Sequence, residues 1–384
     1  MELKIDDTVV YSSSFDEKTG NVVRAVEDFG DRWNNPLYEK ARSRFPHRWG
    51  KVASPSPELC DIAITNRCDF GCSFCYQDSK GRNPHGRRDL VEKILGGFTT
   101  VPYQIAIGGG EPTMHPDFPY ILRKAREMGT VPNYTTAGHH MTDEIVEATN
   151  EVCGGVAMTY HSFRGFDWFK EHYLALRKQL KVKLNIHLIA DKNVAKNLKT
   201  LVANRDELGP LSIVLLAYYP DVGRASLDGM MTRTVYMKHL PEEITIARNC
   251  AVDISFSEGL LPYFMSRPKL GVNTQFAMPS EGLFSCYFDH TGRISESSFD
   301  GPDRREKHTV FNRASQKLWD GLSTRHSEPS GEACYGCPQR SRCSVLHDYF
   351  YYICDYASHN SLPLDTKEEP VIRRSLFERL DEED

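Results

Sequence analysis

Apolar and polar positions alternate in a regular way between residues 60 and 220 of this 384-residue chain. Short, nearly continuous apolar runs predict buried strands, and the segments between them carry apolar residues at helical spacing. The strands are expected at residues 61–65, 103–107, 131–136, 155–160, 182–189 and 211–217. Strict alternation of strands and helices predicts a parallel sheet that helices cover.

Each segment between two strands presents one apolar face. The expected helices are built on Leu90/Val91/Ile94/Leu95, on Phe118/Ile121/Leu122/Ala125/Met128, on residues 143–150, on Phe169/Tyr173/Leu176/Leu180 and on Val194/Leu198/Leu201/Val202. Gly129 is expected to end the second helix, and Asp143-Glu144 gives the third an acidic first turn. Six such repeats predict an α/β fold, an incomplete (β/α)6 TIM-like barrel, whose active site lies at the carboxyl ends of its strands.

The two flanks of this region lack the alternation. Before it, residues 9–11 and 21–24 predict a β-hairpin within an N-terminal extension, which serves either as a packing element or as a substrate-recognition arm. After it, a helix is expected near 241–250, with two or three short antiparallel strands. The clearest turn there is Asp289-His290-Thr291-Gly292. A charged terminal helix is expected at 365–384.

Composition excludes several classes of protein. The net charge of −5 provides no general attraction to nucleic acid or acidic membranes. No apolar run approaches the roughly 18–20 residues that a membrane-spanning helix needs. The N-terminus lacks the basic start and apolar core of a signal peptide. We therefore expect a cytoplasmic protein with neither nucleic acid nor a membrane as its partner.

Cysteines suggest the chemistry, because seven of the eleven fall into two groups. The first group, Cys68, Cys72 and Cys75, follows the first expected strand. Three thiolates cannot complete a four-coordinate structural zinc site, but they can hold three irons of a cubane cluster and leave the fourth iron open. The second group, Cys334, Cys337, Cys343 and Cys354, offers four thiolates, which suit either zinc or a [4Fe-4S] cluster. Of the rest, Cys60 and Cys153 are expected in the core, and Cys250 and Cys286 match no ligand position.

A glycine-rich turn follows the second expected strand. It reads Gly108-Gly109-Gly110-Glu111-Pro112. Glycines let a backbone approach a ligand closely, and a carboxylate at this position can pair with an ammonium group.

Together these motifs resemble the radical S-adenosylmethionine (radical SAM) enzymes. Thr65-Asn66-Arg67-Cys68-x3-Cys72-x-Phe74-Cys75-Tyr76 is similar to their cluster loop. The resemblance implies a [4Fe-4S] cluster on the three cysteines, whose open iron takes SAM. An electron from the cluster then cleaves SAM to a 5'-deoxyadenosyl radical, which abstracts hydrogen from a substrate. It also implies that Phe74 and Tyr76 lie against the adenine, and that Gly109, Gly110, Glu111 and Pro112 receive the SAM amino group.

Other positions follow from the same resemblance. Family members use polar residues on the fourth and fifth strands for the SAM ribose and carboxylate, which here implies Thr159 and Asn185. The fourth strand reads Thr159-Tyr160-His161 where Ser-x-Asp is usual, and residues 218–224 resemble the family's adenine-side segment. Histidines on barrel strands, such as His161 and His187, are more typical of hydrogen-bonded core positions than of catalysts.

The second cysteine group resembles the SPASM extension, which carries auxiliary [4Fe-4S] clusters. Gly292 matches its hairpin glycine, and Ser280, Ser297 and His347 stand where cysteines of the first auxiliary cluster are expected. We therefore expect one auxiliary cluster, on Cys334, Cys337, Cys343 and Cys354, with zinc as the alternative. The expected domains are an N-terminal extension (1–55), the partial barrel (56–235), the SPASM-like domain (236–362) and a charged tail (363–384).

The resemblance implies a radical SAM oxidoreductase with an electron donor such as flavodoxin or ferredoxin. SPASM-type enzymes most often modify peptides or proteins, so a ribosomally made peptide is the favoured substrate. The alternatives are a small-molecule enzyme that makes a cofactor or metabolite, and a non-catalytic iron–sulfur or zinc redox sensor. The glycine turn at Gly109–Pro112 argues against the sensor, which needs no cradle for SAM.

Overall fold

A computed structural model describes residues 1–26, 36–44, 52–220, 222–265, 267–272, 280–301 and 305–322. They divide into two compact units. The first unit comprises Met1–Thr159, Glu171–Asn185 and Ser280–Arg325, and the second includes Tyr160–Lys170 and Ile186–Pro279.

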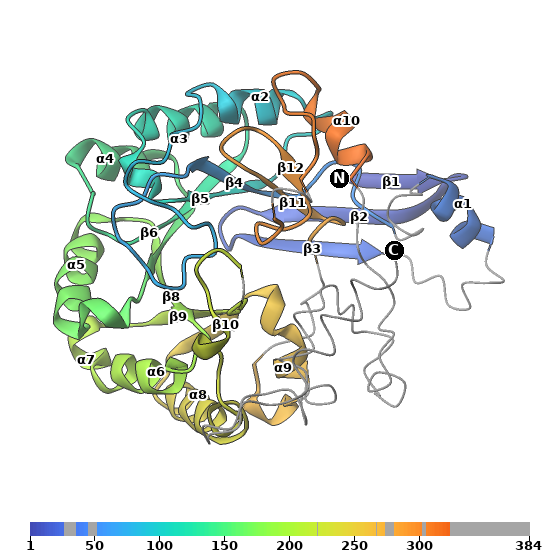
Figure 1. The fold of residues 1–384 in the computed structure, drawn as a ribbon. Coiled ribbons are helices and arrows are strands. Elements are labelled where there is room, and N and C mark those ends of the chain that lie inside the picture. The colour runs from blue at the N-terminus through green and yellow to red at the C-terminus, as the bar shows by residue number, and fades with distance from the viewer. Residues whose placement is uncertain are drawn as a thin grey trace. The chain divides into compact units, whose positions relative to one another are not determined.

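Parallel strands and covering helices form the centre of the first unit. The strands are β4 (Leu59–Thr65), β5 (Gln104–Gly109), β6 (Val131–Thr136) and β7 (Gly155–Thr159), and the helices are α2 (Leu90–Gly96), α3 (Phe118–Glu127) and α4 (Asp143–Val152). Neighbouring strands pair in parallel, with Ile62 opposite Ile107 and Ile107 opposite Tyr134. Figure 1 shows α2, α3 and α4 in a row along one side of these strands. The predicted alternation is confirmed.

Strand alternation divides the residues of β4 between two faces. Cys60, Ile62 and Ile64 are buried in the apolar core that α2 and α3 also line. Because successive side chains point to opposite faces of a sheet, Asp61, Ala63 and Thr65 point away from the helices. This second face is the interior side of the predicted barrel.

Local signals place the helix ends in this unit where the sequence predicts them. The side chain of Thr142 caps α4 by accepting a hydrogen bond from the Ile145 N–H at 3.3 Å. Gly129 follows α3 with a φ of 92°, and its N–H donates to the Arg126 carbonyl at 3.0 Å. Because a left-handed residue is a common helix stop, the predicted end at Gly129 is confirmed.

The second unit continues the repeats. Its strands β8 (Lys183–Ile189), β9 (Ser212–Leu216) and β10 (Asp253–Phe256) pair in parallel from Ile186 onward. The helices are α5 (Phe166–Gln179), α6 (Val194–Ala203), α7 (Arg205–Leu208), α8 (Leu240–Asn249) and α9 (Leu261–Met265), and α5 and β8 each contribute residues to both units.

The helix expected near 241–250 is confirmed as α8. No strand was predicted at β10, which lies parallel to β9 and follows α8 as a further β/α repeat. The strand is only four residues long and reads Asp-Ile-Ser-Phe, with Asp253 and Ser255 exposed. So short a segment, with two polar residues in four, gives little strand signal in the sequence.

The predicted turn at residues 289–292 is confirmed, but its surroundings are not as expected. It joins β11 (Ser285–Phe288) to β12 (Ile294–Ser295), which pair antiparallel. β11 also pairs in parallel with β4, and this places Cys286 opposite Cys60 with their sulfurs 3.6 Å apart. A segment expected in the SPASM-like domain therefore extends the sheet of the first unit. The helix α10 (Ser315–Asp320) lines the same core through Leu318 and Trp319.

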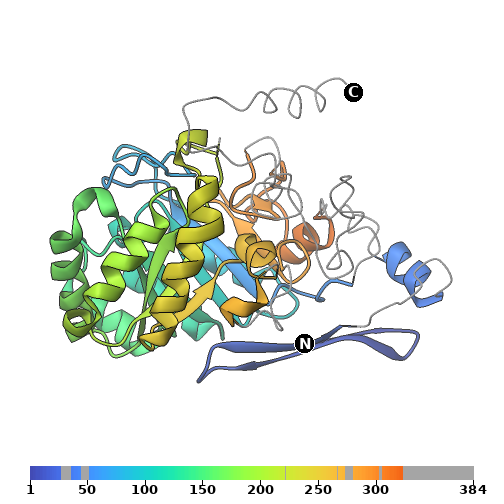
Figure 2. The ribbon, with the colours of Figure 1, turned by 90° about the horizontal axis from the view of Figure 1, so that it is seen from below.

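The N-terminal residues form a separate three-stranded antiparallel sheet in the first unit. Its strands are β1 (Glu2–Ile5), β2 (Thr8–Asp16) and β3 (Asn21–Val26), with α1 (Pro36–Arg44) after them. Figure 2 shows the three strands as a long dark-blue ribbon. The β2–β3 hairpin is confirmed, and β1 was not predicted. The buried Glu58 anchors this sheet, because it accepts hydrogen bonds from Tyr11 and Arg24.

Short one-turn helices complete the described elements. They are η3 (Pro112–Met114), η4 (Ser162–Arg164), η5 (Leu227–Gly229), η7 (Glu258–Leu260), η8 (Pro268–Leu270) and the π-helical turn η6 (Val235–His239). In the part of the chain that the structure describes, no helix has the length and apolar character to cross a membrane. The expected terminal helix at 365–384 lies outside the described residues.

Candidate active site

The first cysteine group lies on the loop that leaves the carboxyl end of β4. Cys68, Cys72 and Cys75 are each partly exposed, and none of them forms a disulfide within the described residues. The loop folds back on itself, since the Cys75 N–H donates to the Cys72 carbonyl at 3.4 Å and the Cys68 N–H donates to the Lys80 carbonyl at 3.2 Å. Burial raises the pKa of the Cys68 thiol. A bound cation would offset this effect, because a metal deprotonates its thiol ligands.

The glycine turn after β5 packs directly against the start of this loop. The Gly110 N–H donates to the Thr65 carbonyl at 2.8 Å, and the Glu111 N–H donates to the Arg67 carbonyl at 2.9 Å. A Cβ on Gly109 would lie 2.2 Å from the Thr65 oxygen, and one on Gly110 would lie 2.1 Å from the Arg67 oxygen. Gly109 also has a φ of 109°, which side chains disfavour. The fold thus brings the two predicted motifs together, and close backbone contact explains both glycines.

Replacing Gly110 with alanine should therefore disrupt the site. We expect Gly110→Ala to lose most bound iron and to melt at a lower temperature, because the Arg67 backbone would have to move. Gly108→Ala is the matched control, since a Cβ on Gly108 would meet nothing within 4 Å. Iron analysis of both reconstituted variants, together with thermal unfolding, checks this. Equal iron content and equal melting temperatures would contradict the packing role of Gly110.

Glu111 is buried, with 3% of its surface exposed, and it links the ends of β5 and β6. One oxygen, Oε1, accepts from the hydroxyls of Thr113 at 2.6 Å and Thr136 at 2.7 Å, and from the Thr113 N–H at 3.3 Å. The other, Oε2, accepts from the Ala137 N–H at 2.7 Å. A carboxylate offers about four acceptor sites. Protein donors therefore occupy Oε1, whereas Oε2 accepts a single hydrogen bond and keeps one acceptor site.

The remaining predicted SAM contacts lie at other strand ends of the first unit. Phe74 and Tyr76 are partly buried on the cluster loop, and the Tyr76 ring packs on Phe299 with centroids 4.7 Å apart. Pro112 begins η3, and Thr159 is buried at the end of β7. The Asn185 Oδ1 on β8 is a buried acceptor without a hydrogen-bond partner in the described structure. Because an unpaired buried acceptor is costly, it suits a donor from a bound molecule.

The other barrel positions singled out in the sequence lie in the second unit. His187 on β8 is of intermediate exposure, and desolvation lowers its pKa to about 4, which keeps the imidazole neutral at pH 7. In residues 218–224, the Tyr218 hydroxyl donates to the Ser226 carbonyl at 2.7 Å and accepts from the Ser226 N–H at 2.9 Å. The Tyr218 side chain therefore binds the backbone of the loop that follows it.

Sequence reasoning missed Asp61, which points to the interior face of β4. Burial, followed by the neighbouring Glu281 carboxylate, raises its pKa to about 7. Tyr287 lies opposite Asp61 on β11, and Gln77 donates hydrogen bonds to the hydroxyls of Tyr287 at 3.0 Å and Tyr76 at 3.2 Å. The feature of the sequence that could have identified Asp61 is a single carboxylate within an otherwise apolar strand.

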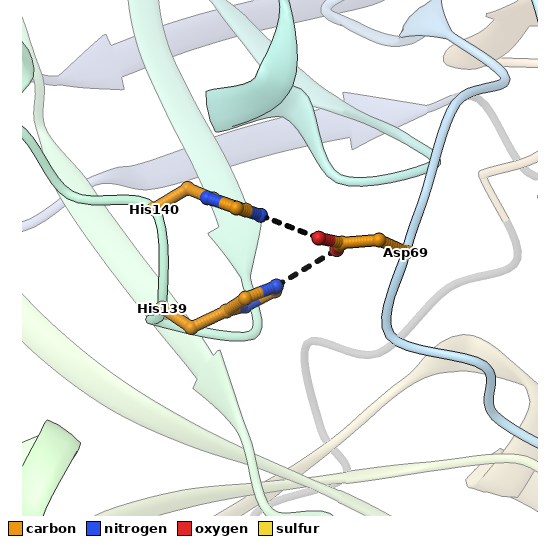
Figure 3. Close-up of side chains that lie close together, drawn as sticks. All are labelled: Asp69, His139 and His140. Carbon is orange, nitrogen blue, oxygen red and sulfur yellow. Dashed lines mark hydrogen bonds and ion pairs between the residues drawn. The ribbon is translucent and has the colours of Figure 1, made fainter. Parts of the chain in front are cut away.

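Sequence reasoning also missed His139 and His140, which follow β6. Each donates from Nε2 to one oxygen of Asp69 at 2.9 Å, and Asp69 lies between Cys68 and Cys72 (Figure 3). Partial burial raises the pKa of Asp69, but the hydrogen bonds from both histidines outweigh it and lower the pKa overall. The feature of the sequence that could have identified them is a pair of adjacent histidines directly after a barrel strand.

The second cysteine group, Cys334, Cys337, Cys343 and Cys354, lies outside the described residues, as does His347. Of the three positions where other residues stand in place of SPASM cysteines, the structure describes Ser280 and Ser297. The Ser297 hydroxyl donates to Glu281 Oε1 at 2.8 Å, and the Ser285 hydroxyl donates to the Ser280 hydroxyl at 3.1 Å. The auxiliary site and the domain boundaries stay predictions.

The family model "Radical SAM superfamily" matches residues 62–190, which hold the cysteine loop and the glycine turn. This part of the chain is a radical SAM domain. The resemblance seen in the sequence is thereby confirmed. A SPASM-like region beyond this domain stays a prediction.

The chain also resembles curated proteins. The chain is 29% identical over 208 residues to the cofactor-modifying protein of tungsten-containing aldehyde ferredoxin oxidoreductase from Pyrococcus furiosus, over 52% of this chain and 51% of that protein. It is 26% identical over 162 residues to GTP 3',8-cyclase from Pectobacterium atrosepticum, over 37% of this chain and 49% of that protein. The chain thus spans about half the length of these relatives.

Solved structures share the fold at low identity. SuiB of Streptococcus suis, bound to its precursor peptide SuiA, aligns with a TM-score of 0.65 at 13% identity, over 87% of this chain and 81% of SuiB. The protein anSMEcpe, with bound AdoMet and the Cp18Cys peptide, aligns with a TM-score of 0.58 at 15% identity, over 80% of this chain and 93% of its own. Together with the family match, this likeness confirms the predicted radical SAM fold class.

Proposed function

We propose that this protein is a radical SAM enzyme that abstracts hydrogen from an organic substrate. Cys68, Cys72 and Cys75 would hold a [4Fe-4S] cluster. When bound, the cluster supplies the electron that cleaves SAM and so generates the 5'-deoxyadenosyl radical. The observation that carries the proposal is the pair of backbone hydrogen bonds from Gly110 and Glu111 to Thr65 and Arg67, which hold the glycine turn against the cluster loop.

The residues present fit both the [4Fe-4S] cluster and SAM. Three cysteine thiols on one loop suit three irons, and the Asn185 Oδ1, which has no hydrogen-bond partner among the described residues, suits a hydroxyl donor such as a ribose. We infer that Gly109, Gly110, Glu111 and Pro112 receive the SAM amino group, for which the glycine backbone and Glu111 Oε2, with its single protein hydrogen bond from the Ala137 N–H, offer acceptors. The ring of Tyr76 and the nearby Phe74 would lie against the adenine, and Thr159 would contact the SAM ribose or carboxylate.

Asp61 is the proposed proton-handling group on the interior face. Its pKa of about 7 lets it exchange a proton near neutral pH. In this role Asp61 would hold or release the proton of a substrate group, while Gln77 fixes the nearby hydroxyls of Tyr76 and Tyr287.

A peptide or protein side chain is the proposed substrate. Structures of similar fold contain peptides, namely SuiA with SuiB and Cp18Cys with anSMEcpe. The second candidate is a small molecule, which the similarity to two GTP 3',8-cyclases favours. We further propose that Cys334, Cys337, Cys343 and Cys354 bind an auxiliary [4Fe-4S] cluster. An electron donor such as ferredoxin or flavodoxin would reduce the protein, and we propose a cytoplasmic location for it.

Anaerobically reconstituted protein tests the proposal. With dithionite and SAM it should release 5'-deoxyadenosine, and about eight irons per chain are expected for two [4Fe-4S] clusters. Four irons with one zinc would reject the auxiliary cluster but keep the enzyme. Protein with a full cluster that forms no 5'-deoxyadenosine would reject the enzyme. Mass spectrometry with short peptides encoded beside the gene then separates the substrates, because a mass change in a peptide excludes the small-molecule alternative.

A further inference from the structure

Two histidines and one carboxylate converge beside the cluster loop. Asp69 belongs to the loop after β4, and His139 and His140 belong to the loop between β6 and α4. The donor atoms of the three residues all lie within 4.8 Å of one another. Figure 3 shows both imidazole rings directed at the same carboxylate from one side.

The fold holds both histidines in place. Their loop is fixed at Ala137, whose N–H donates to Glu111, and at Gly138, whose N–H donates to the Thr136 hydroxyl at 2.9 Å. The His139 ring packs against Phe70 with centroids 5.0 Å apart, and the two histidine rings lie 4.1 Å apart. Positioned imidazoles bind a metal with little loss of side-chain freedom.

The distances suit a metal ion after a small adjustment. Each Nε2 lies 2.9 Å from an Asp69 oxygen. Ligand atoms bound at ~2.0–2.2 Å around a tetrahedral ion lie ~3.3–3.5 Å apart, so the groups need to separate by only about half an ångström. Asp69 is 43% exposed and His140 is 37% exposed, so an ion can reach the cluster of residues from solvent.

We propose that Asp69, His139 and His140 bind a divalent transition-metal ion, with Zn²⁺ as the representative, at a site separate from the iron–sulfur cluster. Imidazole with one carboxylate suits zinc or ferrous iron, whereas magnesium and calcium prefer oxygen ligands. Three protein ligands leave one position for water. The ion would clamp the loop between Cys68 and Cys72 to the end of β6.

The alternative is that Asp69, His139 and His140 only hydrogen-bond to one another and bind no ion. Two variants distinguish the metal site from this hydrogen-bonded arrangement. Asp69→Asn keeps one oxygen that can accept a hydrogen bond but removes the negative charge that an ion needs. His140→Gln removes one nitrogen ligand from a partly exposed position. His239→Gln is the matched control, because His239 is 48% exposed just before α8 and its ion-pair partner, Glu242 at 3.6 Å, lies far from the cysteine loop in the sequence.

The test uses anaerobic holoprotein whose cysteines already carry iron, treated with chelator and then titrated with Zn²⁺ before gel filtration. We expect one zinc per chain in the wild type and in His239→Gln, with at least ~10-fold weaker binding in Asp69→Asn and His140→Gln. Zinc-edge X-ray absorption should show nitrogen and oxygen neighbours at ~2.0–2.1 Å without sulfur at ~2.3 Å.

Three results would overturn the site: no zinc retained by the wild type, equal affinity in all four proteins, or a sulfur shell around the zinc. Iron content and melting temperature establish that each variant is folded and loaded. Formation of 5'-deoxyadenosine is measured separately, so the zinc site and the proposed enzyme activity can fail independently of each other.

Discussion

The variant Cys72→Ala is expected to lose all reductive cleavage of SAM, with 5'-deoxyadenosine falling to the level seen without protein. Cys72 is the middle ligand of the predicted trio, and its carbonyl accepts from the Cys75 N–H within the loop. Two thiolates cannot hold a site-differentiated [4Fe-4S] cluster, so about four irons per chain should also be lost. Anaerobic iron analysis and chromatography of the nucleoside product measure both effects.

The matched control is Cys250→Ala. Cys250 is a free, partly exposed thiol at the end of α8, in the second unit, and no ligand role is predicted for it. This variant should keep wild-type iron and wild-type product formation. If Cys72→Ala retained both, the cluster would have to reside on other cysteines, and the assignment of Cys68, Cys72 and Cys75 would be wrong.

Replacing Glu111 with glutamine should lower stability and SAM affinity together. The amide keeps one acceptor oxygen, so its NH₂ must face either the Ala137 N–H or the hydroxyls of Thr113 and Thr136. A buried donor left facing another donor costs about 1–3 kcal/mol. The melting temperature should fall by several degrees, and SAM should bind more weakly because the glycine turn loses its anchor to β6.

Thermal unfolding and equilibrium binding of SAM to the reconstituted variant test this expectation. The control is Glu92→Gln, since Glu92 is a partly buried glutamate of the same unit that accepts one hydrogen bond, from the Tyr120 hydroxyl at 2.8 Å. It should change stability little. Weaker SAM binding in Glu111→Gln at unchanged melting temperature would instead indicate that the carboxylate contacts SAM directly.

Much of the fold could be predicted because its signals are local. The apolar runs of β4 to β9 and the apolar faces of α2 to α6 repeat within a few residues. The predicted ends of the six strands therefore lie within about two residues of the observed ends. The cysteine spacing and the glycine turn are short motifs whose place after β4 and β5 follows from the same pattern. β10 was not predicted, because four residues carry too little pattern.

The sequence alone determined the radical SAM domain: six strand–helix repeats, a loop with three cysteines and a glycine turn at the next strand end. Only the tertiary structure decided that β11 joins β4, that protein donors occupy Glu111, and that His139 and His140 meet Asp69. The physical reason is separation along the chain. Periodicity reports which face a residue occupies, whereas contacts across about 70 or 200 residues depend on how whole elements pack.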